Sequence, residues 1–211
     1  MYDYKKFWQW FENHNEQLTM LGDLDNQQRQ LLLDQLQQQL DTYCPGLSFE
    51  MGEPTPNGRK LTFSAEGDTD LFRYLLDLTD NAPDLDWWEF IAFKQPNGTA
   101  LRVRFDRYTF NTSKMHFMEL ECEEEPEFMG LRVAVDLAEI SGGKEVPQPD
   151  EEDLQVGVYV TIEAMIGEFD CATMLGYLEV VPVPDEPFKA GFRPLDDLPE
   201  YVEWFKKNRE K

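Results

Sequence analysis

Apolar residues at the start of the chain recur every three or four positions, which is the spacing of one face of an α-helix. The first such stripe consists of Tyr4, Phe7, Trp8, Phe11 and Leu18. A second helix is expected from the cap residue Asp25 to about Tyr43, because this run is rich in helix-forming residues and carries leucines four positions apart. Its many glutamines also fit a low-complexity interaction tract, but the leucine stripe favours a helix docked on a core. The pattern therefore predicts a helical hairpin over residues 1–44.

From Leu47 the apolar positions alternate with polar ones, as they do in strands that bury one face. Residues 47–53 and 60–65 flank a Pro-Asn-Gly turn and predict a β-hairpin. A capped helix follows and ends near Pro83. The other predicted elements are strands at 88–94, about 100–109, about 114–122, 128–137 and about 173–183, and a terminal helix at about 198–209 with Tyr201, Trp204 and Phe205 inward.

The segment 150–169 fits both a strand and a helix. The alternating residues of the strand pattern are Val156, Val158, Val160 and Ile162. The residues that would share a helix face are Leu154, Val158, Ile162, Met165 and Phe169. The length of the segment and its acidic first turn, which suits the positive end of a helix dipole, favour a buried helix.

These elements together predict an α+β fold. We expect a mostly antiparallel sheet of about 6–7 strands, an N-terminal helical hairpin, central helices and a C-terminal helix. No internal repeat is visible, and no linker is long enough to divide the chain. A single α+β domain over residues 1–211, with the helical segment 1–44 packed on it, is the expected organisation.

The charge of the chain narrows the classes of partner. Asp and Glu number 42 against 19 Lys and Arg, so the formal net charge is −23. A surface of this sign repels the phosphates of nucleic acids and the headgroups of anionic membranes. No apolar run approaches the roughly 18–20 residues that a membrane-spanning helix needs, and the N-terminus lacks the pattern of a signal peptide. We therefore expect a cytoplasmic protein that binds neither nucleic acid nor membrane.

The sequence motifs of several large enzyme classes are absent. The chain has no phosphate-binding loop, no dinucleotide-binding glycine motif, no HExxH and no GxSxG. Its two histidines and three widely spaced cysteines form no metal-binding or disulfide pattern, so neither metal nor cofactor is expected. Carboxylates alone can carry out acid–base catalysis, so the question of enzyme activity stays open while a non-enzymatic role is favoured.

The region 101–122 predicts a hairpin closed near Asn111-Thr112. In this register the charged residues on one face pair across the strands, Arg102 and Arg104 with Glu121 and Glu119. The apolar residues of the other face are Leu101, Val103, Phe105, Met118 and Leu120, with His116 at the edge of the core. This pairing explains the positions of the two arginines and the histidine, so no ligand site is needed to account for them.

Four residues of the chain are nevertheless candidates for a ligand site. Arg102 and Arg104 belong to the densest basic stretch and could hold a carboxylate or phosphate. His116 could bind a metal or transfer a proton. Glu163, if the 150–169 helix is buried, would have a raised pKa suited to acid–base work. No residue is assigned a catalytic role on this basis.

A second set of residues is expected to bind a partner protein. An exposed tryptophan on an acidic surface can stack on cationic side chains, and adjacent tryptophans of a strand face opposite ways. The candidates are Trp87, Trp88, Glu123, Glu124, Glu125 and Glu127. The favoured function is an acidic, immunity- or regulator-like module that binds a basic protein. The alternative is a small hydrolase or transferase that uses carboxylates such as Glu163 and Glu168 with the arginines at 102–107.

Several stretches of the chain resemble known sequences. The run from LSFEMG to RKLTFSAEG, the segment WWEFIAFKQP and the later IEAMIGEFD are similar to acidic bacterial α+β proteins of families whose domains have no known function. The resemblance covers about residues 1–180 and centres on residues 88–93 and 166–168. These residues are packing positions, so the resemblance implies a fold and no functional residues.

Overall fold

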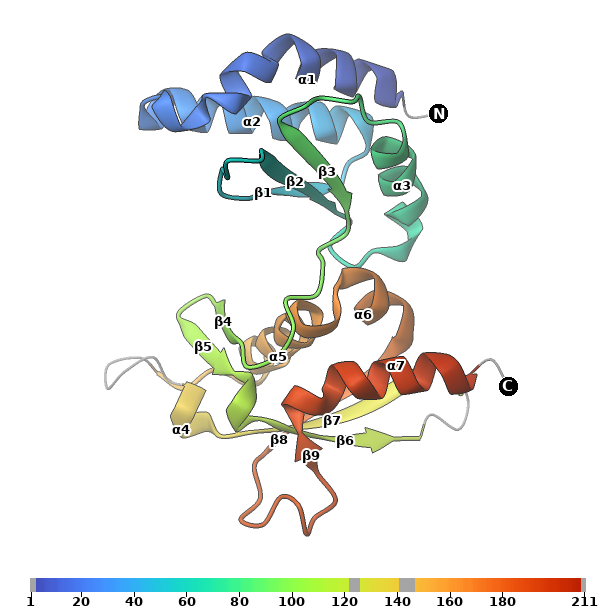
Figure 1. Cartoon of the computed structure of the whole chain (residues 1–211). Helices are drawn as coiled ribbons and strands as arrows, with labels where there is room; N and C mark the ends of the chain where they lie inside the picture. Colours follow the sequence, from blue (N-terminus) through green and yellow to red (C-terminus); the bar gives the residue numbers. More distant parts are fainter. Residues whose placement is uncertain (1–2, 122–125, 141–146, 210–211) are drawn as a thin grey trace. The chain divides into compact units, whose positions relative to one another are not determined.

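The computed structural model describes residues 3–121, 126–140 and 147–209, and its contacts divide the chain into two compact units (Figure 1). The first unit is Met1–Lys94 and the second is Gln95–Lys211. The single domain expected over residues 1–211 stays a prediction. Within the described ranges, no helix combines the length and hydrophobicity that crossing a lipid bilayer requires.

The first unit places its helices and a small sheet in the order that the sequence pattern indicates. Its elements are α1 (Tyr4–Thr19), η1 (Leu21–Asp23), α2 (Asn26–Tyr43), β1 (Ser48–Met51), β2 (Arg59–Ser64), η2 (Thr69–Leu71), α3 (Phe72–Asp80) and β3 (Trp88–Ala92). The N-terminal helical hairpin and the β1–β2 hairpin are confirmed.

Side-chain caps and apolar stripes explain the two long helices of this unit. Asp25 accepts a hydrogen bond from the backbone N–H of Gln28 at 2.8 Å and so caps α2, which ends before Pro45. The apolar stripes of both helices are buried, with Phe11 and Leu36 fully enclosed. Trp8 donates its Nε1–H to the carbonyl oxygen of Leu78 at 2.9 Å, which ties α1 to α3.

The sheet of the first unit is mixed. β1 and β2 are antiparallel, and β2 and β3 are parallel, with Leu61 opposite Phe90 and Phe63 opposite Ala92. A parallel neighbour requires a crossover, and α3 supplies it. Alternation within a strand does not reveal the direction of its neighbour, so the expectation of mostly antiparallel pairing was wrong for this strand.

The second unit contains two sheets and the remaining helices. Its strands are β4 (Arg102–Phe105), β5 (Tyr108–Asn111), β6 (His116–Leu120), β7 (Met129–Val135), β8 (Leu175–Pro182) and β9 (Arg193–Pro194). Its helices are η3 (Thr112–Lys114), α4 (Leu137–Ile140), α5 (Glu151–Ile166), α6 (Glu168–Met174), η4 (Leu195–Asp197) and α7 (Leu198–Arg209). The helix favoured for 150–169 is confirmed, as is the terminal helix.

The strands of the described residues form three small sheets of three, two and four strands, and not one sheet of about 6–7. Among the described strands of the second unit, β4 and β5 form a two-stranded sheet, and the larger sheet has the order β8-β7-β6-β9. β7 and β8 are parallel, which α5 and α6 make possible by connecting them. The α+β class is correct, whereas the single sheet was wrong.

The hairpin expected over 101–122 is also wrong. A two-residue turn at Asp106-Arg107, with Asp106 at φ +50°, closes β4 onto β5. Arg102 therefore lies opposite Asn111 and Arg104 opposite Thr109, while Glu119 lies opposite Leu131 of β7. Asp tolerates a positive φ better than most residues, and this property permits a turn that the apolar pattern does not mark.

The core of the second unit lies between α5, α7 and the larger sheet. Phe110, Phe117, Leu131, Val133, Val158 and Ile162 are fully buried there. α7 lies along one face of this sheet, and its Tyr201 ring is 5.7 Å from the ring of Phe117 (Figure 1). This packing sets the relation of α7 to β6, where the candidate site lies.

Candidate functional site

A cleft with an aromatic wall and acidic rim opens between the end of β6 and α7. It has a volume of about 590 Å³ and is lined by Glu119, Leu120, Glu121, Pro126, Phe128, Met129, Tyr201, Trp204, Phe205 and Asn208. A second hollow of about 380 Å³ adjoins it and is lined by Glu119, Arg193, Asp197, Glu200, Tyr201 and Trp204. Because three residues line both hollows, we treat them together as the aromatic cleft.

Helix α7 supplies the aromatic wall of this cleft. Tyr201, Trp204 and Phe205 are three and four positions apart, so they share one side of the helix. The Tyr201 and Trp204 rings are stacked with centroids 5.8 Å apart. Tyr201 and Phe205 are partly buried as expected, but Trp204 is 57% exposed, so its expected inward position was wrong.

Strand β6 supplies the acidic side of the cleft. Residues 117, 119 and 121 follow the alternation of the strand, so the side chains of Glu119 and Glu121 lie on the same face as buried Phe117. Phe117 is covered by Tyr201, whereas both glutamates are exposed. The carboxylates therefore stand where the cover of α7 ends and the cleft begins.

Arg193 of the short strand β9 contacts both walls of the cleft. Its guanidinium pairs with the carboxylate of Glu119. The guanidinium carbon lies 5.0 Å from the centroid of the Phe117 ring and 5.2 Å from that of Tyr201. An arginine that pairs with a carboxylate and lies over two rings uses both attractions that such a cleft offers to a cation.

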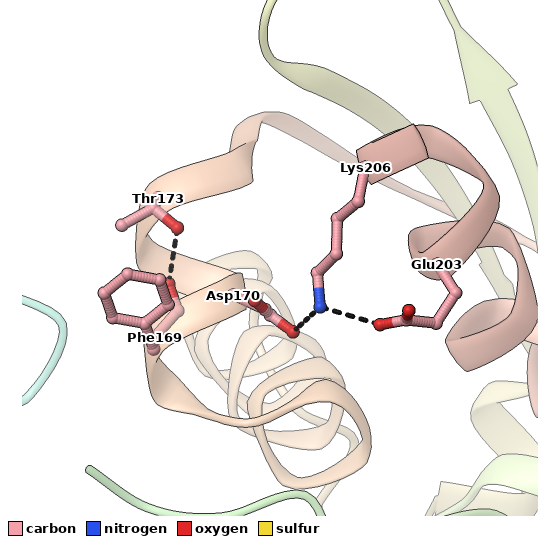
Figure 2. Close-up of polar contacts among 5 residues, drawn as sticks. All are labelled: Phe169, Asp170, Thr173, Glu203 and Lys206. Atoms are coloured by element: carbon pink, nitrogen blue, oxygen red, sulfur yellow. Dashed lines mark hydrogen bonds and ion pairs between the residues drawn. The ribbon is translucent and has the colours of Figure 1, made fainter. Parts of the chain in front are cut away.

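An ion-pair network holds α7 from its other side. Lys206 pairs with Asp170 of α6 at 2.5 Å and with Glu203 at 2.7 Å (Figure 2). Figure 2 shows Asp170 directed toward Lys206 while the Phe169 ring lies away from it. Partial burial alone would lower the pKa of Lys206, but the hydrogen bonds to the two carboxylates outweigh this effect and raise it. The lysine is thus a charged link between the two helices.

The described lining of the cleft is strongly negative. It carries four carboxylates, from Glu119, Glu121, Asp197 and Glu200, and one guanidinium, from Arg193. Carboxylates beside exposed aromatic rings attract ammonium or guanidinium groups and repel anions.

The residues that the sequence analysis proposes for partner binding do not all lie in the same part of the chain. Glu127 is exposed and lies between Pro126 and Phe128, which line the cleft, while Glu123, Glu124 and Glu125 lie outside the described residues. Trp87 and Trp88 belong to the first unit.

Neither Trp87 nor Trp88 is fully exposed. Trp88 is 8% exposed and donates its Nε1–H to Asn15 at 2.7 Å. Trp87 is half-buried, and its buried Nε1 has no hydrogen-bond partner among the described residues. The two tryptophans therefore do not form the exposed aromatic surface that the sequence pattern suggests.

The basic and histidine candidates do not converge on one site. Arg102 and Arg104 are exposed on β4, and Arg104 donates its Nε–H to the carbonyl oxygen of Asp106 at 3.1 Å. His116 is half-buried at the start of β6, with its ring 5.5 Å from that of Phe188. Burial lowers the pKa of His116, and its Nδ1 has no hydrogen-bond partner among the described residues.

Glu163 lies close to Glu168, Cys171 and the half-buried Tyr159. Glu163 is 7% exposed and Glu168 is fully buried. Burial and the nearby carboxylates raise the pKa of Cys171 to about 12, against the opposing effect of a hydrogen bond with Tyr159. Burial and the neighbouring thiol also raise the pKa of Tyr159. The two glutamates and Cys171 are buried, while the arginines that the alternative enzyme would use are exposed.

The sequence pattern missed the cleft and Arg193. The aromatic residues of α7 were expected in the core, and β9 is only two residues long, too short for an alternation to be visible. Within the described residues, no three His, Cys, Asp or Glu side chains gather in a way that could hold a metal ion. No protein-family model matches the chain, and no curated protein or solved structure is significantly similar to it.

Proposed function

We propose that this protein is a non-enzymatic, acidic interaction module of the cytoplasm, and that its aromatic cleft binds a basic segment of a partner protein. The observation that carries the proposal is the contact of Arg193 with Glu119 and Tyr201, because the chain's own guanidinium already uses the binding chemistry of the cleft. An immunity- or regulator-like role fits a surface of this kind, since the site of a nucleic-acid-binding partner is basic.

Exposed Trp204 gives the cleft a central anchor. Tryptophan and tyrosine are enriched among the residues that contribute most to binding at protein interfaces. A guanidinium or ammonium group near such a ring gains about 0.5–2 kcal/mol, depending on how far water is excluded. The carboxylates around it add attraction at a distance and increase the rate of association. Anchor and charge together favour a partner with Arg or Lys side chains.

The alternative, a carboxylate-dependent hydrolase or transferase, has less support. Its carboxylates, Glu163 and Glu168, are buried, whereas Arg102 and Arg104 are exposed on β4. General acid–base catalysis requires the carboxylate to come within hydrogen-bond distance of the substrate. The cleft, in contrast, is open and has cation-binding groups on both walls.

A titration with a basic peptide tests the proposal. The probe is an acetylated and amidated octapeptide of alternating arginine and valine, and binding is measured by calorimetry at low and high salt. We expect Glu119→Gln/Glu121→Gln to weaken binding about tenfold, with a smaller salt dependence than in the wild type. The matched control, Glu12→Gln/Glu16→Gln, removes the same charge from exposed positions of α1 and should leave affinity nearly unchanged.

The aromatic anchor is tested by a second pair of variants. Trp204→Ala should weaken binding of the octapeptide by about tenfold, whereas Phe169→Ala, at another exposed aromatic position of the same unit, should not. Equal affinity of the wild type, Trp204→Ala and Glu119→Gln/Glu121→Gln would refute the proposed site. An octapeptide that fails to bind the wild type at low salt would refute the proposed function.

A further inference from the structure

The edge of the larger sheet beside the cleft is incompletely paired. β6 pairs with β7 along all five of its residues, from His116 to Leu120. On its other side, β9 pairs only with His116 and Phe117. Among the described residues, Met118–Leu120 therefore pairs with a strand on the β7 side and with none on the β9 side. In Figure 1, β6 continues past β9, and the connection that precedes β9 descends on the side away from α7.

The hydrogen-bonding direction of each residue on this edge follows from the pairing beside it. Leu195, directly after β9, donates its N–H to the carbonyl oxygen of Met115, directly before β6, at 2.9 Å. Backbone groups alternate in direction along a strand, so the odd-numbered residues of β6 direct their N–H and C=O groups toward β9. The N–H and C=O of Glu119 therefore face the side where β9 has ended. A partner backbone could form hydrogen bonds with these groups, as an added strand does.

We infer that the basic segment of the partner binds as an extended strand added to this edge, antiparallel to β6 and continuing the row that β9 begins. This inference rests on the proposed function. An added residue opposite Glu119 has its side chain on the same face as Glu119, beside Tyr201 and Trp204. The strand therefore carries Arg or Lys at alternate positions, and its intervening side chains lie on the face of Met118 and Leu120.

Arg193 is the example of this arrangement within the chain. It lies opposite Phe117 in β9, and its side chain reaches Glu119 and Tyr201 on the α7 face of the sheet. The next basic residue of an added strand occupies the equivalent place two residues further along the edge, where the larger hollow and Glu121 lie. The same acidic side chains oppose addition of a second copy of this edge, because glutamates of the two copies would approach one another.

Backbone N-methylation of the octapeptide tests strand addition without altering the protein. One peptide carries N-methyl groups on its arginines, whose N–H groups face β6 in the inferred arrangement, and another carries them on its valines, whose N–H groups face away. We expect the first to bind about tenfold more weakly than the unmodified peptide and the second to bind within about twofold of it. Hydrogen exchange at the Glu119 amide should slow on binding, while that at Leu120, already paired with β7, should not change.

The outcomes separate this inference from the proposed function. If the unmodified octapeptide binds in a manner that depends on Glu119 and Glu121 but both methylated peptides bind alike, the partner segment is held by side chains only and strand addition is wrong. A weaker valine-methylated peptide with an unaffected arginine-methylated one would refute the antiparallel arrangement. If no peptide binds the wild type at low salt, both the inference and the proposed function fail.

Discussion

The guanidinium of Arg193 lies 5.2 Å from the centre of the Tyr201 ring while it pairs with Glu119. Residues from β6, β9 and α7 thus meet around a single positive charge. The chain has only 19 basic residues against 42 acidic ones, and one of the few lies in the aromatic cleft. In the proposed function, Arg193 occupies part of the site that binds cations and has the geometry that we propose for an arginine of the partner.

Removal of the Arg193 charge should therefore strengthen binding of a basic peptide. In Arg193→Gln, Glu119 loses its intramolecular partner and becomes available to the ligand, so we expect affinity for the arginine–valine octapeptide to rise about two- to fivefold. The free energy of unfolding should fall by at most about 1 kcal/mol, because both side chains of the pair are more than two-fifths exposed.

The matched control for this variant is Arg132→Gln. Arg132 pairs with Glu179 at 2.7 Å on the same sheet, and these side chains have similar exposure. A similar small loss of stability is expected, with no change in peptide affinity. Weaker binding by Arg193→Gln would mean that Arg193 is part of the contact surface and does not compete with the ligand.

Gly157 of α5 should not tolerate a methyl group. A Cβ atom at this position would lie 2.3 Å from Cζ of Phe110, whose side chain is fully buried. Helix propensity alone would favour alanine by about 1 kcal/mol. Overpacking in a core typically costs about 1–3 kcal/mol, and here the ring that would have to move is itself fully buried. We therefore expect Gly157→Ala to be less stable than the wild type in urea unfolding.

Two further variants complete this test. Gly22→Ala adds a methyl group where no heavy atom lies within 4 Å and should change stability little. Phe110→Leu should lose less stability in the Gly157→Ala background than alone, because the smaller side chain relieves the contact. Additive effects would contradict the close packing of the ring against the helix.

Asp196 should make stability depend on pH in the acid range. Its carboxylate accepts hydrogen bonds from Thr112 Oγ1 at 2.6 Å, Ser113 Oγ at 2.8 Å and the N–H of Ala100 at 3.0 Å. Partial burial would raise the pKa of Asp196, but these hydrogen bonds outweigh burial and lower it. The resulting stabilisation is present above the unfolded pKa of about 3.9 and is lost as pH falls through the lowered folded value.

Asp196→Asn should accordingly cost about 1–3 kcal/mol at pH 7, because the amide accepts fewer hydrogen bonds and has no charge. The difference from the wild type should shrink below pH 4 in urea unfolding measured across the acid range. Ser113→Ala removes one donor of three and should cost less at pH 7. A difference that stays constant down to pH 2 would show that the charge of Asp196 is not responsible.

In the first unit, Trp8→Phe should be more costly than Trp10→Phe. The Nε1–H of Trp8 satisfies the buried carbonyl of Leu78, and the ring is 4% exposed. The variant leaves that acceptor without its donor and should lose about 1–3 kcal/mol. Trp10 is half-buried and stacks on His14, so its replacement should cost clearly less. Chemical unfolding of both variants gives the comparison, and equal losses would contradict the role of the hydrogen bond.

Periodic patterns in the sequence predict a helix or strand well where that element buries only one of its faces. The leucines of α2 and the capped start of α5 identify helices that the structure contains. They do not predict which strands pair, because partners are chosen by turns and crossovers. The apolar pattern predicts that Glu119 pairs with Arg104 across a hairpin. The two-residue turn at Asp106-Arg107 instead pairs β4 with β5, and the observed ion-pair partner of Glu119 is Arg193.

The cleft was hidden from the pattern for a related reason. Tyr201, Trp204 and Phe205 form an apolar stripe on α7, and such a stripe indicates burial. On the face of β6 that packs against α7, however, Phe117 is the last apolar residue, and the following positions on that face carry glutamates. Only the pairing of β6 with β7 and β9 shows that Trp204 extends past the core and faces carboxylates.

The central claim, that the aromatic cleft binds basic segments, is tested most directly by mapping amide chemical shifts during titration with the arginine–valine octapeptide. We predict that the largest changes fall on Glu119–Glu121 and on Tyr201–Asn208, and that Glu119→Gln/Glu121→Gln greatly reduces them. Changes confined to other surfaces, or changes of equal size in that variant, would contradict the account.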